Sequence, residues 1–457
     1  MKKRTQTKKT RRAFVKKVAL GTSLLAGAPQ FLSGATPTTF LQRQKKYTAN
    51  DRIQIALIGA GGMGVEDTKT ALRIPGVELV AVCDLYDGRL AAAKERWGKA
   101  LFTTRNYREI LERSDVDAVI IGTPDHWHKQ ISIDAMNKGK SVYCEKPMVH
   151  QVEEGREVLN AQNKTKKTFQ VGSQGMSSLG NEKAKELYEA GAIGQLIYAE
   201  GFWARNSPVG AWQYDIPKDA SSKTVDWENY LSNTNKRDFD PLRFFRWRNY
   251  RDYGTGVSGD LFVHLFSSLH FIVGSKGPNK IMATGGLRFW KDGREVPDVL
   301  LGMFDYPESP NHPAFNLSLR VNFVDGTSGS TYLKLVGSEG AMDVKWREVV
   351  LRKNESFDPM DDPFLQQKSM ESSKLILPKR KKILSPPEVV FKTEEGYMGA
   401  HYDHFTNFFN GVRTGDSVAE DALFGYQAAA PALLCNDSYF DNKIIHWDPE
   451  KLMVLNH

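Results

Sequence analysis

Three glycines and one aspartate have the spacing of a dinucleotide site. Gly59, Gly61 and Gly64 form a G-x-G-x-x-G pattern after an apolar run, and Asp84 follows Gly64 by twenty residues. The first glycine permits a tight turn, the second lets a pyrophosphate approach the backbone, and the third lets a helix pack closely on a strand. A carboxylate at Asp84 can accept hydrogen bonds from ribose hydroxyls and would repel a 2′-phosphate. The pattern favours NAD over NADP, and the nearby Arg89 keeps NADP open.

A parallel sheet is needed to position these residues. Residues 52–58 are typical of a buried strand, and strand-like and helical stretches alternate after it. Strands joined by helical crossovers imply a parallel sheet. The expected strands are 78–83, 118–121, 141–144 and 168–172, and the expected helices are 90–97, 107–113, 129–138 and 155–165.

The pattern of the chain changes after about Gly175. Apolar residues alternate with polar ones over 315–323, which is typical of a half-buried antiparallel strand. Helical patterns occupy 183–190 and return over 401–440. Residues 355–387 are rich in Ser, Lys, Pro and Asp and are interpreted as a solvated insertion. The second half therefore combines strands and helices in a different order from the first.

Length and charge exclude several classes of protein. A chain of 457 residues suits two domains, and 40% hydrophobic with 25% charged residues is typical of a globular protein. The net charge of +8 comes from residues 1–35, which hold nine basic residues and no acidic one. The rest of the chain has 53 basic and 54 acidic residues, so its composition does not indicate a nucleic-acid partner.

The first 35 residues have the features of an export signal. Residues 10–16 have the sequence TRRAFVK, which resembles the twin-arginine motif S/T-R-R-x-F-L-K. A weakly apolar run over 18–28 is too short to span a bilayer, and the small residues over 33–35 are the expected cleavage site. We expect a signal peptide over 1–35, an extended arm over 36–51, the twin-arginine export machinery as a partner, and a periplasmic location. A basic tail with a chance Arg-Arg pair is the alternative.

The cysteine and histidine residues do not indicate a metal site. Cys83, Cys144 and Cys435 are widely separated, so we expect small buried residues and no disulfide framework. His126 and His128 lack a known zinc-ligand spacing. No later segment is long and apolar enough for a transmembrane anchor.

Several ordered motifs resemble one oxidoreductase family. The chain has GTPDHWH over 122–128, AMNKGKSVYCEKP over 135–147, GAIG over 191–194, GDLFVH over 259–264 and VGSEG over 336–340. These are similar to the T-P-x-x-x-H, A-x-x-x-G-K and E-K-P motifs of the Gfo/Idh/MocA family, named in part for glucose–fructose oxidoreductase and inositol dehydrogenase. The resemblance covers nearly all of the chain after residue 51.

The resemblance implies a fold and a site. It implies an α/β Rossmann domain, placed at 52–174, followed by an α+β domain with a large, mostly antiparallel sheet at 175–457. It also implies that Lys146 lies beside the nicotinamide and the substrate hydroxyl, and that Asp260 and His264 face the same cleft. The expected cofactor-binding residues are Gly59, Gly61, Gly62, Met63, Gly64, Asp84, Thr123, Pro124, His128, Glu145 and Lys146.

The three expected catalytic residues suit oxidation of a hydroxyl group. Asp260 and His264 are four residues apart and would share a helix face. A neutral His264 can take the hydroxyl proton, with Lys146 as the rival base. Lys146 can also donate to the substrate oxygen and stabilise alkoxide charge, while Asp260 holds and polarises the other two groups.

Aromatic and polar residues over 202–253 suggest a sugar site. Trp203, Arg205 and Trp247 are candidate substrate contacts, because flat rings stack on sugar C–H faces and arginines bind hydroxyls. Aromatic residues that build the second core are an equal alternative. Gln174 is a further candidate, since it stands where the family often has an arginine.

These observations predict an exported NAD(P)-dependent oxidoreductase acting on a secondary hydroxyl of a sugar, polyol or glycoside. Export separates the enzyme from cytoplasmic NADH, so a tightly bound and recycled coenzyme is expected. One alternative is a glycosidase or lyase that oxidises C3 transiently; in this family such glycosidases lack E-K-P and carry a Tyr/His pair instead of Asp260/His264. A non-catalytic sugar-binding module is the other alternative. Family members often pair through the open sheet, so a homo-oligomer is expected.

Overall fold

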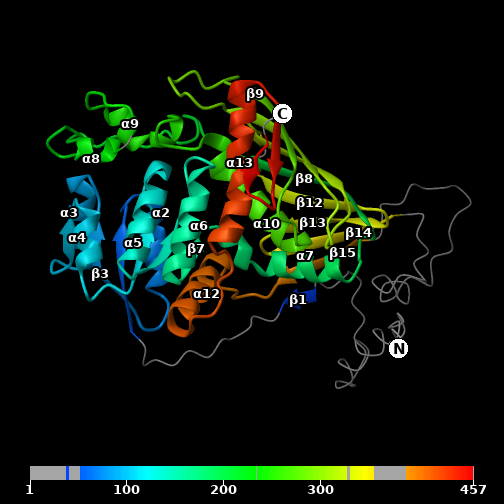
Figure 1. Ribbon diagram of the computed structural model, residues 1–457, viewed down its shortest axis with the longest axis horizontal. Coiled ribbons are helices and arrows are strands. Elements are labelled where there is room, and N and C mark those ends of the chain that lie inside the picture. The colour runs from blue at the N-terminus through cyan, green and yellow to red at the C-terminus, as the bar shows by residue number, and fades with distance from the viewer. Residues whose placement is uncertain (1–37, 41–51, 233, 327–329, 355–387, 456–457) are drawn as a thin grey trace, which may run out of the picture. The chain divides into compact units, whose positions relative to one another are not determined.

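The computed structural model describes residues 38–40, 52–232, 234–326, 330–354 and 388–455. The predicted signal peptide, the predicted insertion over 355–387 and most of the predicted arm lie outside these ranges. Two sheets organise the described chain (Figure 1).

The first sheet is parallel and has six strands in the order β4-β3-β2-β5-β6-β7. Its central strands are almost wholly buried, as expected where helices cover both faces. The strands are β2 (Ile53–Ile58), β3 (Val77–Cys83), β4 (Phe102–Thr104), β5 (Ala118–Ile121), β6 (Ser141–Cys144) and β7 (Phe169–Val171). The helices between them are α2 (Gly62–Ala71), α3 (Asp87–Trp97), α4 (Tyr107–Glu112), η1 (Asp125–Trp127), α5 (His128–Asn137) and α6 (Glu154–Thr165).

The second sheet has eleven strands in the order β1-β15-β14-β13-β12-β8-β11-β10-β9-β16-β17. Only β1 with β15 and β8 with β11 run parallel; the other neighbours are antiparallel. The strands are β1 (Thr38–Phe40), β8 (Leu196–Ala204), β9 (Lys280–Gly286), β10 (Val299–Tyr306), β11 (Phe315–Asn322), β12 (Thr331–Gly337), β13 (Gly340–Lys345), β14 (Glu348–Lys353), β15 (Glu388–Thr393), β16 (Ile445–Asp448) and β17 (Met453–Val454).

Helices pack against one face of the second sheet and against one another. They are η2 (Gln174–Ser177), α7 (Leu179–Glu189), η4 (Ser258–Phe262), α10 (Val263–Val273) and α13 (Ala422–Asp441). A further helix, α12 (Ala400–Thr414), belongs late in the sequence but packs on the first sheet. Its Phe405 and Phe408 share a buried cluster with Ile55 of β2. This crossing joins the two sheets into one body and brings α12 to the α2 side of the first sheet.

The segment between β8 and η4 lies over one end of the first sheet. It contains three short helices, α8 (Trp227–Leu231), α9 (Pro241–Phe245) and η3 (Trp247–Asn249). In Figure 1, α8 and α9 lie beyond the end of α3 and α4. A backbone bridge joins Tyr86 to Val225, and both residues belong to an aromatic cluster with Tyr230 and Phe244. We call residues 205–253 the cover segment.

The predicted fold class is confirmed, with two differences in detail. The strand predicted over 315–323 forms as β11 with alternating burial, but it is antiparallel only to β10 and runs parallel to β8. Alternation reports which side chains face the core and carries no information on the direction of a neighbour. The short strand β4 was not predicted, because its residues Phe102–Thr104 (FTT) are not a buried apolar run.

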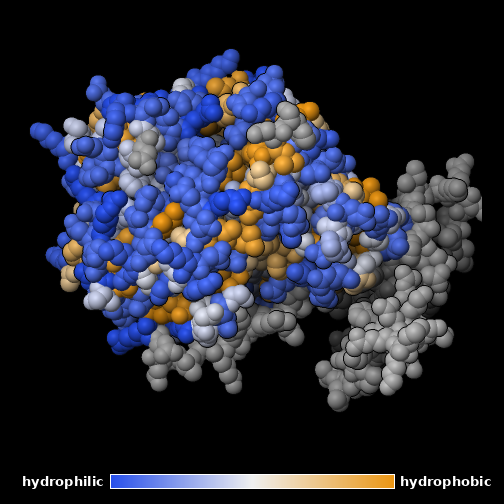
Figure 2. All heavy atoms as spheres, viewed as in Figure 1, coloured by the Kyte–Doolittle hydropathy of each residue, from blue (hydrophilic) through white to orange (hydrophobic). Residues whose placement is uncertain are grey.

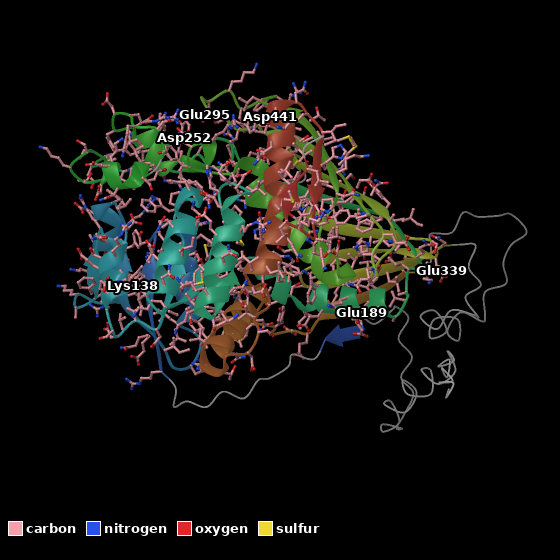
Figure 3. All side chains as sticks on the ribbon, in the orientation of Figure 1. Lys138, Glu189, Asp252, Glu295, Glu339 and Asp441 are labelled. Carbon is pink, nitrogen blue, oxygen red and sulfur yellow. The ribbon has the colours of Figure 1, made fainter. Side chains whose placement is uncertain are left out.

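The surface seen in Figure 2 is largely hydrophilic, and the three cysteines are buried. Hydrophobic residues form separate patches on this face. Lys138 and Glu189, which are labelled in Figure 3, are two of the exposed charged residues. The three cysteines are buried and unpaired, as predicted. In the described ranges, no helix is both long and apolar enough to cross a membrane.

Candidate active site

The glycine loop after β2 allows close backbone contact. Gly59 has φ +94°, and a Cβ there would lie 2.6 Å from the Gly122 carbonyl carbon and the Thr123 nitrogen. A Cβ on Gly122 would in turn lie 2.8 Å from Gly64 Cα. Gly59 and Gly64 therefore let the loops after β2 and β5 pack against each other. A Cβ on Gly64 would also lie 3.1 Å from Leu57 Cδ1 of β2, so this glycine lets α2 lie close to the strand.

Gly61 of the motif and the neighbouring Gly62 face open space. A Cβ on Gly62 would meet no atom within 4 Å, and one on Gly61 would meet only the Arg89 guanidinium at 3.9 Å or beyond. Both residues line a cavity at the N-terminus of α2, where free helix N–H groups attract an anion. This open cradle fits a pyrophosphate group.

A single cavity of about 710 Å³ joins the two halves of the chain. Fifteen of the seventeen predicted site residues line it, and Gly64 and His128 do not. The predicted residues in the cavity wall are Gly59, Gly61, Gly62, Met63, Asp84, Thr123, Pro124, Glu145, Lys146, Gln174, Trp203, Arg205, Trp247, Asp260 and His264. We name the two ends of the cavity after Asp84 and Lys146.

Asp84 holds the glycine loop as well as facing the cavity. Its Oδ2 accepts a hydrogen bond from Ala60 N at 2.8 Å, its Oδ1 accepts one from Tyr86 N at 2.9 Å, and Arg89 lies 3.5 Å from Oδ1. Arg105 and Arg108 also line the cavity. The Asp84 end thus combines the carboxylate predicted to favour NAD with three arginines.

The cover segment closes the Asp84 end. Arg89 lies over the Phe244 and Phe245 rings, at 5.6 and 5.5 Å from their centroids. Tyr86 Oη donates to Asp219 at 2.6 Å, and Asp226 N donates to the Leu85 carbonyl at 2.8 Å. The segment is therefore fastened to the loop that follows β3.

At the other end, Lys146 and Asp260 form a buried ion pair. Lys146 Nζ lies 2.8 Å from Asp260 Oδ1 and donates to the Asp260 carbonyl at 2.7 Å. Arg248 Nε reaches the same Oδ1 at 3.2 Å. Burial acts to raise the pKa of Asp260, but Lys146, Arg248 and Arg205 outweigh it and hold the pKa well below its usual range. Asp260 is therefore ionised.

His264 is a buried, neutral imidazole one element further on. Burial lowers its pKa well below the ordinary value, and Lys146 and Arg205 add to this effect, while Asp260 opposes it. Trp203 stacks on its ring at 5.2 Å between centroids, and Trp346 approaches at 6.4 Å. Asp260 lies in the π-helix η4 and His264 in the first turn of α10, so the segment is wider than the regular α-helix predicted from the spacing. Both side chains nevertheless line the cavity.

A second polar group lies beside Lys146. Gln174 Nε2 donates to Glu145 Oε1 at 2.8 Å. Burial, and then the charge of Asp67, raise the pKa of Glu145 to about 8. Asp67 is itself wholly buried, and His401 Nε2 lies 2.9 Å from its Oδ1. Glu145 is therefore mainly a neutral acid at pH 7, and this group adds little negative charge to the cavity.

His128 holds two loops together behind the cavity. Its Nδ1 lies 2.7 Å from the Pro147 carbonyl, and its Nε2 lies 3.0 Å from the Thr123 carbonyl. Burial opposes the charged form, but Cys144, Asp125 and the Pro147 carbonyl outweigh it and raise the pKa of His128 to about 10. A charged ring can donate to both carbonyls, so His128 positions Thr123 and the Lys146 loop. Within the described ranges no cluster of His, Cys, Asp and Glu could hold a metal ion.

The aromatic residues of the cover segment divide between cavity and core. Trp212 and Trp247 line the cavity, whereas Trp227 and Tyr253 belong to the aromatic cluster that supports it. Two further cavity residues were not predicted to belong to the site. Trp346 comes from the turn between β13 and β14, and His401 comes from α12; only the tertiary fold brings them to the site.

The chain matches an oxidoreductase family over both halves. Residues 53–173 match the family described as an NAD-binding Rossmann fold, and residues 185–445 match its C-terminal alpha/beta domain. The chain is 28% identical over 223 residues to an alpha-N-acetylgalactosaminidase of Shewanella oneidensis (47% of this chain, 46% of the relative). It is 30% identical over 198 residues to an inositol 2-dehydrogenase of Rubrobacter xylanophilus (43% and 53%). It thus spans about half the length of these curated relatives.

Solved structures of the same fold cover more of the chain. A levoglucosan dehydrogenase in complex with NADH and levoglucosan is 18% identical, with a TM-score of 0.64 over 87% of this chain and 99% of that one. An oxidoreductase domain protein of Kribbella flavida is 16% identical, with a TM-score of 0.65 over 89% and 100%. Together with the two domain matches, the glycine cradle and the arrangement around Lys146, this shows that the chain belongs to the Gfo/Idh/MocA family of NAD(P)-binding oxidoreductases.

Proposed function

We propose that this protein moves a hydride between a nicotinamide coenzyme and a secondary hydroxyl of a sugar, polyol or glycoside. The observation that carries the proposal is the meeting of Lys146, Asp260 and His264 in the same cavity as the glycine cradle. The inositol and levoglucosan dehydrogenases named above support a polyol or sugar as the substrate class.

The coenzyme would be held along the cavity from Asp84 to Lys146. Gly61, Gly62 and Met63 offer the cradle for its pyrophosphate, and Asp84 faces the position expected for a ribose. When bound, the nicotinamide supplies a hydride acceptor or donor. We favour NAD because Asp84 would repel a 2′-phosphate, and the three arginines beside it make NADP the alternative to test.

The residues at the Lys146 end divide the proton chemistry between them. The neutral His264 can accept the hydroxyl proton, because a low pKa leaves the imidazole unprotonated at working pH. Lys146 is fixed by Asp260 and can donate to the substrate oxygen, which stabilises alkoxide charge. His264 is the proposed base, and Lys146 is the rival.

The direct test follows absorbance of reduced coenzyme with a panel of sugars, polyols and glycosides. Wild-type protein should reduce NAD with at least one of them, and Lys146→Ala should lose this activity while it still binds coenzyme. The matched control is Lys129→Ala, since Lys129 pairs with Glu154 and Glu157 outside the cavity. If no compound changes the absorbance and no coenzyme binds, the proposal is wrong.

We propose that the protein is exported and keeps its coenzyme through repeated turnovers. The TRRAFVK motif supports export by the twin-arginine route, which carries folded proteins to the periplasm. The cover segment supports retention, since it is fastened beside the Asp84 end. Replacing Arg11 and Arg12 by lysine should leave the protein in the cytoplasm, and fractionation of cells measures this. Coenzyme should also remain with the purified protein after gel filtration; prompt loss would argue against retention.

A second candidate is redox-neutral cleavage of a glycoside. The similarity to the alpha-N-acetylgalactosaminidase favours it, and a retained coenzyme suits a cycle of oxidation, elimination and reduction at C3. The intact E-K-P and Asp260/His264 pattern favours the dehydrogenase. Analysis of products from a chromogenic glycoside separates the two: free aglycone without net coenzyme reduction supports cleavage, and a keto-sugar with reduced coenzyme supports dehydrogenation.

A further inference from the structure

The Lys146 end of the cavity holds more positive than negative charge. Lys146, Arg205 and Arg248 line this end, and Asp260 is the carboxylate they share. Glu145 also lines it, but its pKa of about 8 keeps it mainly neutral at pH 7. His264 is neutral as well. One carboxylate therefore faces three cations.

Arg248 contacts Asp260 through only one of its guanidinium nitrogens, Nε. Its Nε contacts Asp260 Oδ1, and its guanidinium carbon lies 4.1 Å from the Trp247 ring centroid. Stacking on Trp247 fixes the plane of the guanidinium, and no described residue is hydrogen-bonded to its Nη groups. Because guanidinium donors match a carboxylate or sulfate in pairs, Arg248 retains a free donor edge.

Arg205 has no side-chain partner among the described residues. It follows the last residue of β8, and its backbone N donates to the Asn322 carbonyl at 3.1 Å, which fixes the start of the loop. Arg205 is an exposed residue that lines the cavity, and its charge acts on both Asp260 and His264. An arginine held near a buried ion pair with its own donors free is suited to bind an incoming anion.

The coenzyme does not account for these two arginines. The cradle for its pyrophosphate lies at the N-terminus of α2, and the Asp84 end has Arg89, Arg105 and Arg108 of its own. Asp215 also lines the cavity, but it is exposed and makes no ion pair with Arg205 or Arg248. The excess of positive charge beside Lys146 is therefore available to bind an anionic group of the substrate.

We infer that the substrate is an anionic sugar, whose carboxylate or sulfate group is bound by Arg205 and Arg248 while the reacting hydroxyl lies at Lys146. This inference rests on the proposed function for the position of the reacting hydroxyl, and it adds a charge requirement to the substrate class. Carboxylate and sulfate share the same chemistry here, because each presents two or more oxygens to a guanidinium.

The test compares matched sugars on the protein loaded with NAD. Methyl glucoside, methyl glucuronide and methyl glucoside 6-sulfate differ only in the group at C6, and both equilibrium binding and NADH formation are measured at low and high salt. We expect the glucuronide or the sulfate to bind about tenfold tighter than the neutral sugar, as a charge-assisted hydrogen bond allows, with the preference reduced by salt. The two charged arms separate a uronate site from a sulfate site.

The variant Arg205→Gln tests whether this arginine binds the anionic group. It should remove most of the preference for the charged sugar, as a rise in KM that is much larger for the charged sugar than for the neutral one, and leave binding of NAD unchanged. Arg96→Gln, an exposed arginine in the last turn of α3, is the matched control and should change nothing.

The outcomes separate this inference from the proposed function. Equal or better binding of the neutral sugar overturns the inference, and so does failure of both charged sugars to bind. Oxidation of a neutral sugar with no charge preference leaves the proposed function standing alone. Selective binding of a charged sugar that is never oxidised supports the charge requirement and counts against the dehydrogenase.

Discussion

At the scale of single residues, the site combines a cation-rich pocket with a histidine that carries no charge. The cations help to keep the histidine neutral, because burial and the nearby charges of Lys146 and Arg205 all lower the pKa of His264. The stacked Trp203 ring adds a flat apolar wall on one side of the imidazole. A neutral acceptor and a fixed cationic donor can therefore face one substrate hydroxyl.

Replacing His264 should remove the proposed base. His264→Gln keeps a polar side chain but cannot take a proton, so kcat for sugar oxidation should fall by roughly 10²–10⁴-fold with little change in coenzyme binding. Because the pKa of His264 lies well below 6.5, the wild-type rate should show no loss of this base until the pH falls well below 6.5. The measurement is kcat/KM against pH for wild type, His264→Gln and the control His446→Gln on β16, outside the cavity. An unchanged kcat in His264→Gln would transfer the role of base to Lys146.

The raised pKa of Glu145 predicts that the free energy of unfolding depends on pH. Its pKa is raised from 4.5 to about 8 in the folded protein, so the folded state keeps a proton that the unfolded state releases above pH 4.5. Stability contributed by this group is complete below pH 4.5 and is lost as the pH rises through 8.

Glu145→Gln removes that dependence. The free energy of unfolding of the variant, relative to wild type, should improve by at least ~1.4 kcal/mol between pH 5 and pH 8, which corresponds to one pKa unit. Urea unfolding at several pH values measures it, with the exposed Glu66→Gln on α2 as the control. A difference between variant and wild type that is constant across this pH range would contradict the raised pKa.

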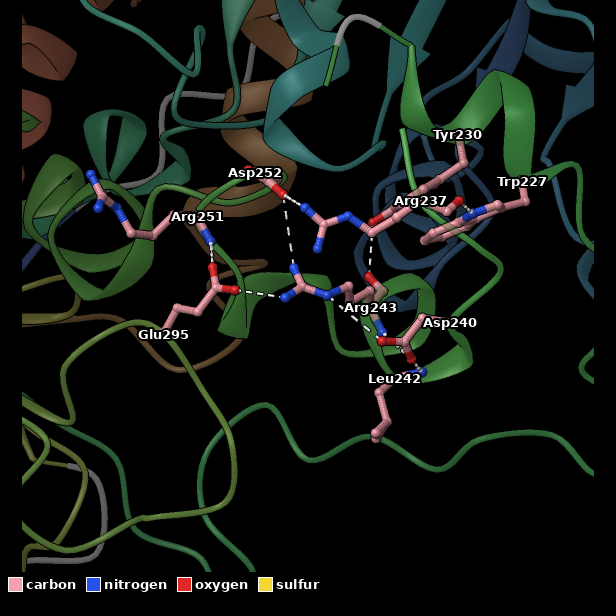
Figure 4. A network of polar contacts seen from close by, with 9 residues as sticks. All are labelled: Trp227, Tyr230, Arg237, Asp240, Leu242, Arg243, Arg251, Asp252 and Glu295. Carbon is pink, nitrogen blue, oxygen red and sulfur yellow. Dashed lines mark hydrogen bonds and ion pairs between the residues drawn. The ribbon is translucent and has the colours of Figure 1, made fainter. Parts of the chain in front are cut away.

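At the scale of elements, the cover segment is held by charge networks as well as by its aromatic cluster. Figure 4 shows Arg243 between Asp252 and Glu295, with Arg237 on the other side of Asp252. Arg243 Nη2 donates to Glu295 Oε1 at 2.7 Å, and the guanidinium carbon of Arg243 lies 4.2 Å from the centroid of the Tyr250 ring. These contacts brace α9, whose Phe244 and Phe245 line the cavity beneath Arg89.

Loosening this brace should speed coenzyme release. Arg243→Ala loses the contacts with both carboxylates, and we expect release of NADH to become roughly tenfold faster, equivalent to about 1.4 kcal/mol. Fluorescence of bound NADH after mixing with excess NAD measures the rate. Arg352→Ala is the matched control, since Arg352 also contacts two carboxylates, Asp343 and Glu388, on β13 and β15. Equal release rates for the two variants would mean that the cover segment does not retain the coenzyme.

All strands of the first sheet except β4 could be predicted, because each of them is a short apolar run and the helices between them have their own period. Local signals located Gly59 and Asp84, and the family resemblance located the E-K-P motif, Asp260 and His264. Trp346 and His401 could not be predicted, since the turn after β13 and the start of α12 reach the cavity only through tertiary packing. Nor could the parallel pairing of β8 with β11, which depends on how distant strands meet.

At the scale of the whole molecule, the two sheets differ in how they are covered. The first is buried by helices on both faces, whereas α7, α10 and α13 pack on one face of the second. On β10, Leu300 and Phe304 are buried while Leu301 and Met303 are exposed by 45% and 53%. The outward face of the described strands thus presents apolar side chains to solvent.

This face predicts that the protein pairs with a second copy of itself. Across the same face, Arg320 of β11 lies 4.8 Å from the Phe202 ring centroid and donates to Tyr332 at 2.8 Å, so the exposed apolar residues border an ordered polar and aromatic surface. Leu301→Glu combined with Met303→Glu places two charges on β10 where a partner would pack, and like charges on both copies would repel. Light scattering after gel filtration should show an oligomer for wild type and a smaller species for the double variant. Leu423→Glu, on the exposed side of α13, should leave the mass unchanged. A wild-type monomer would contradict the prediction, and an oligomer that survives both substitutions would place its interface elsewhere.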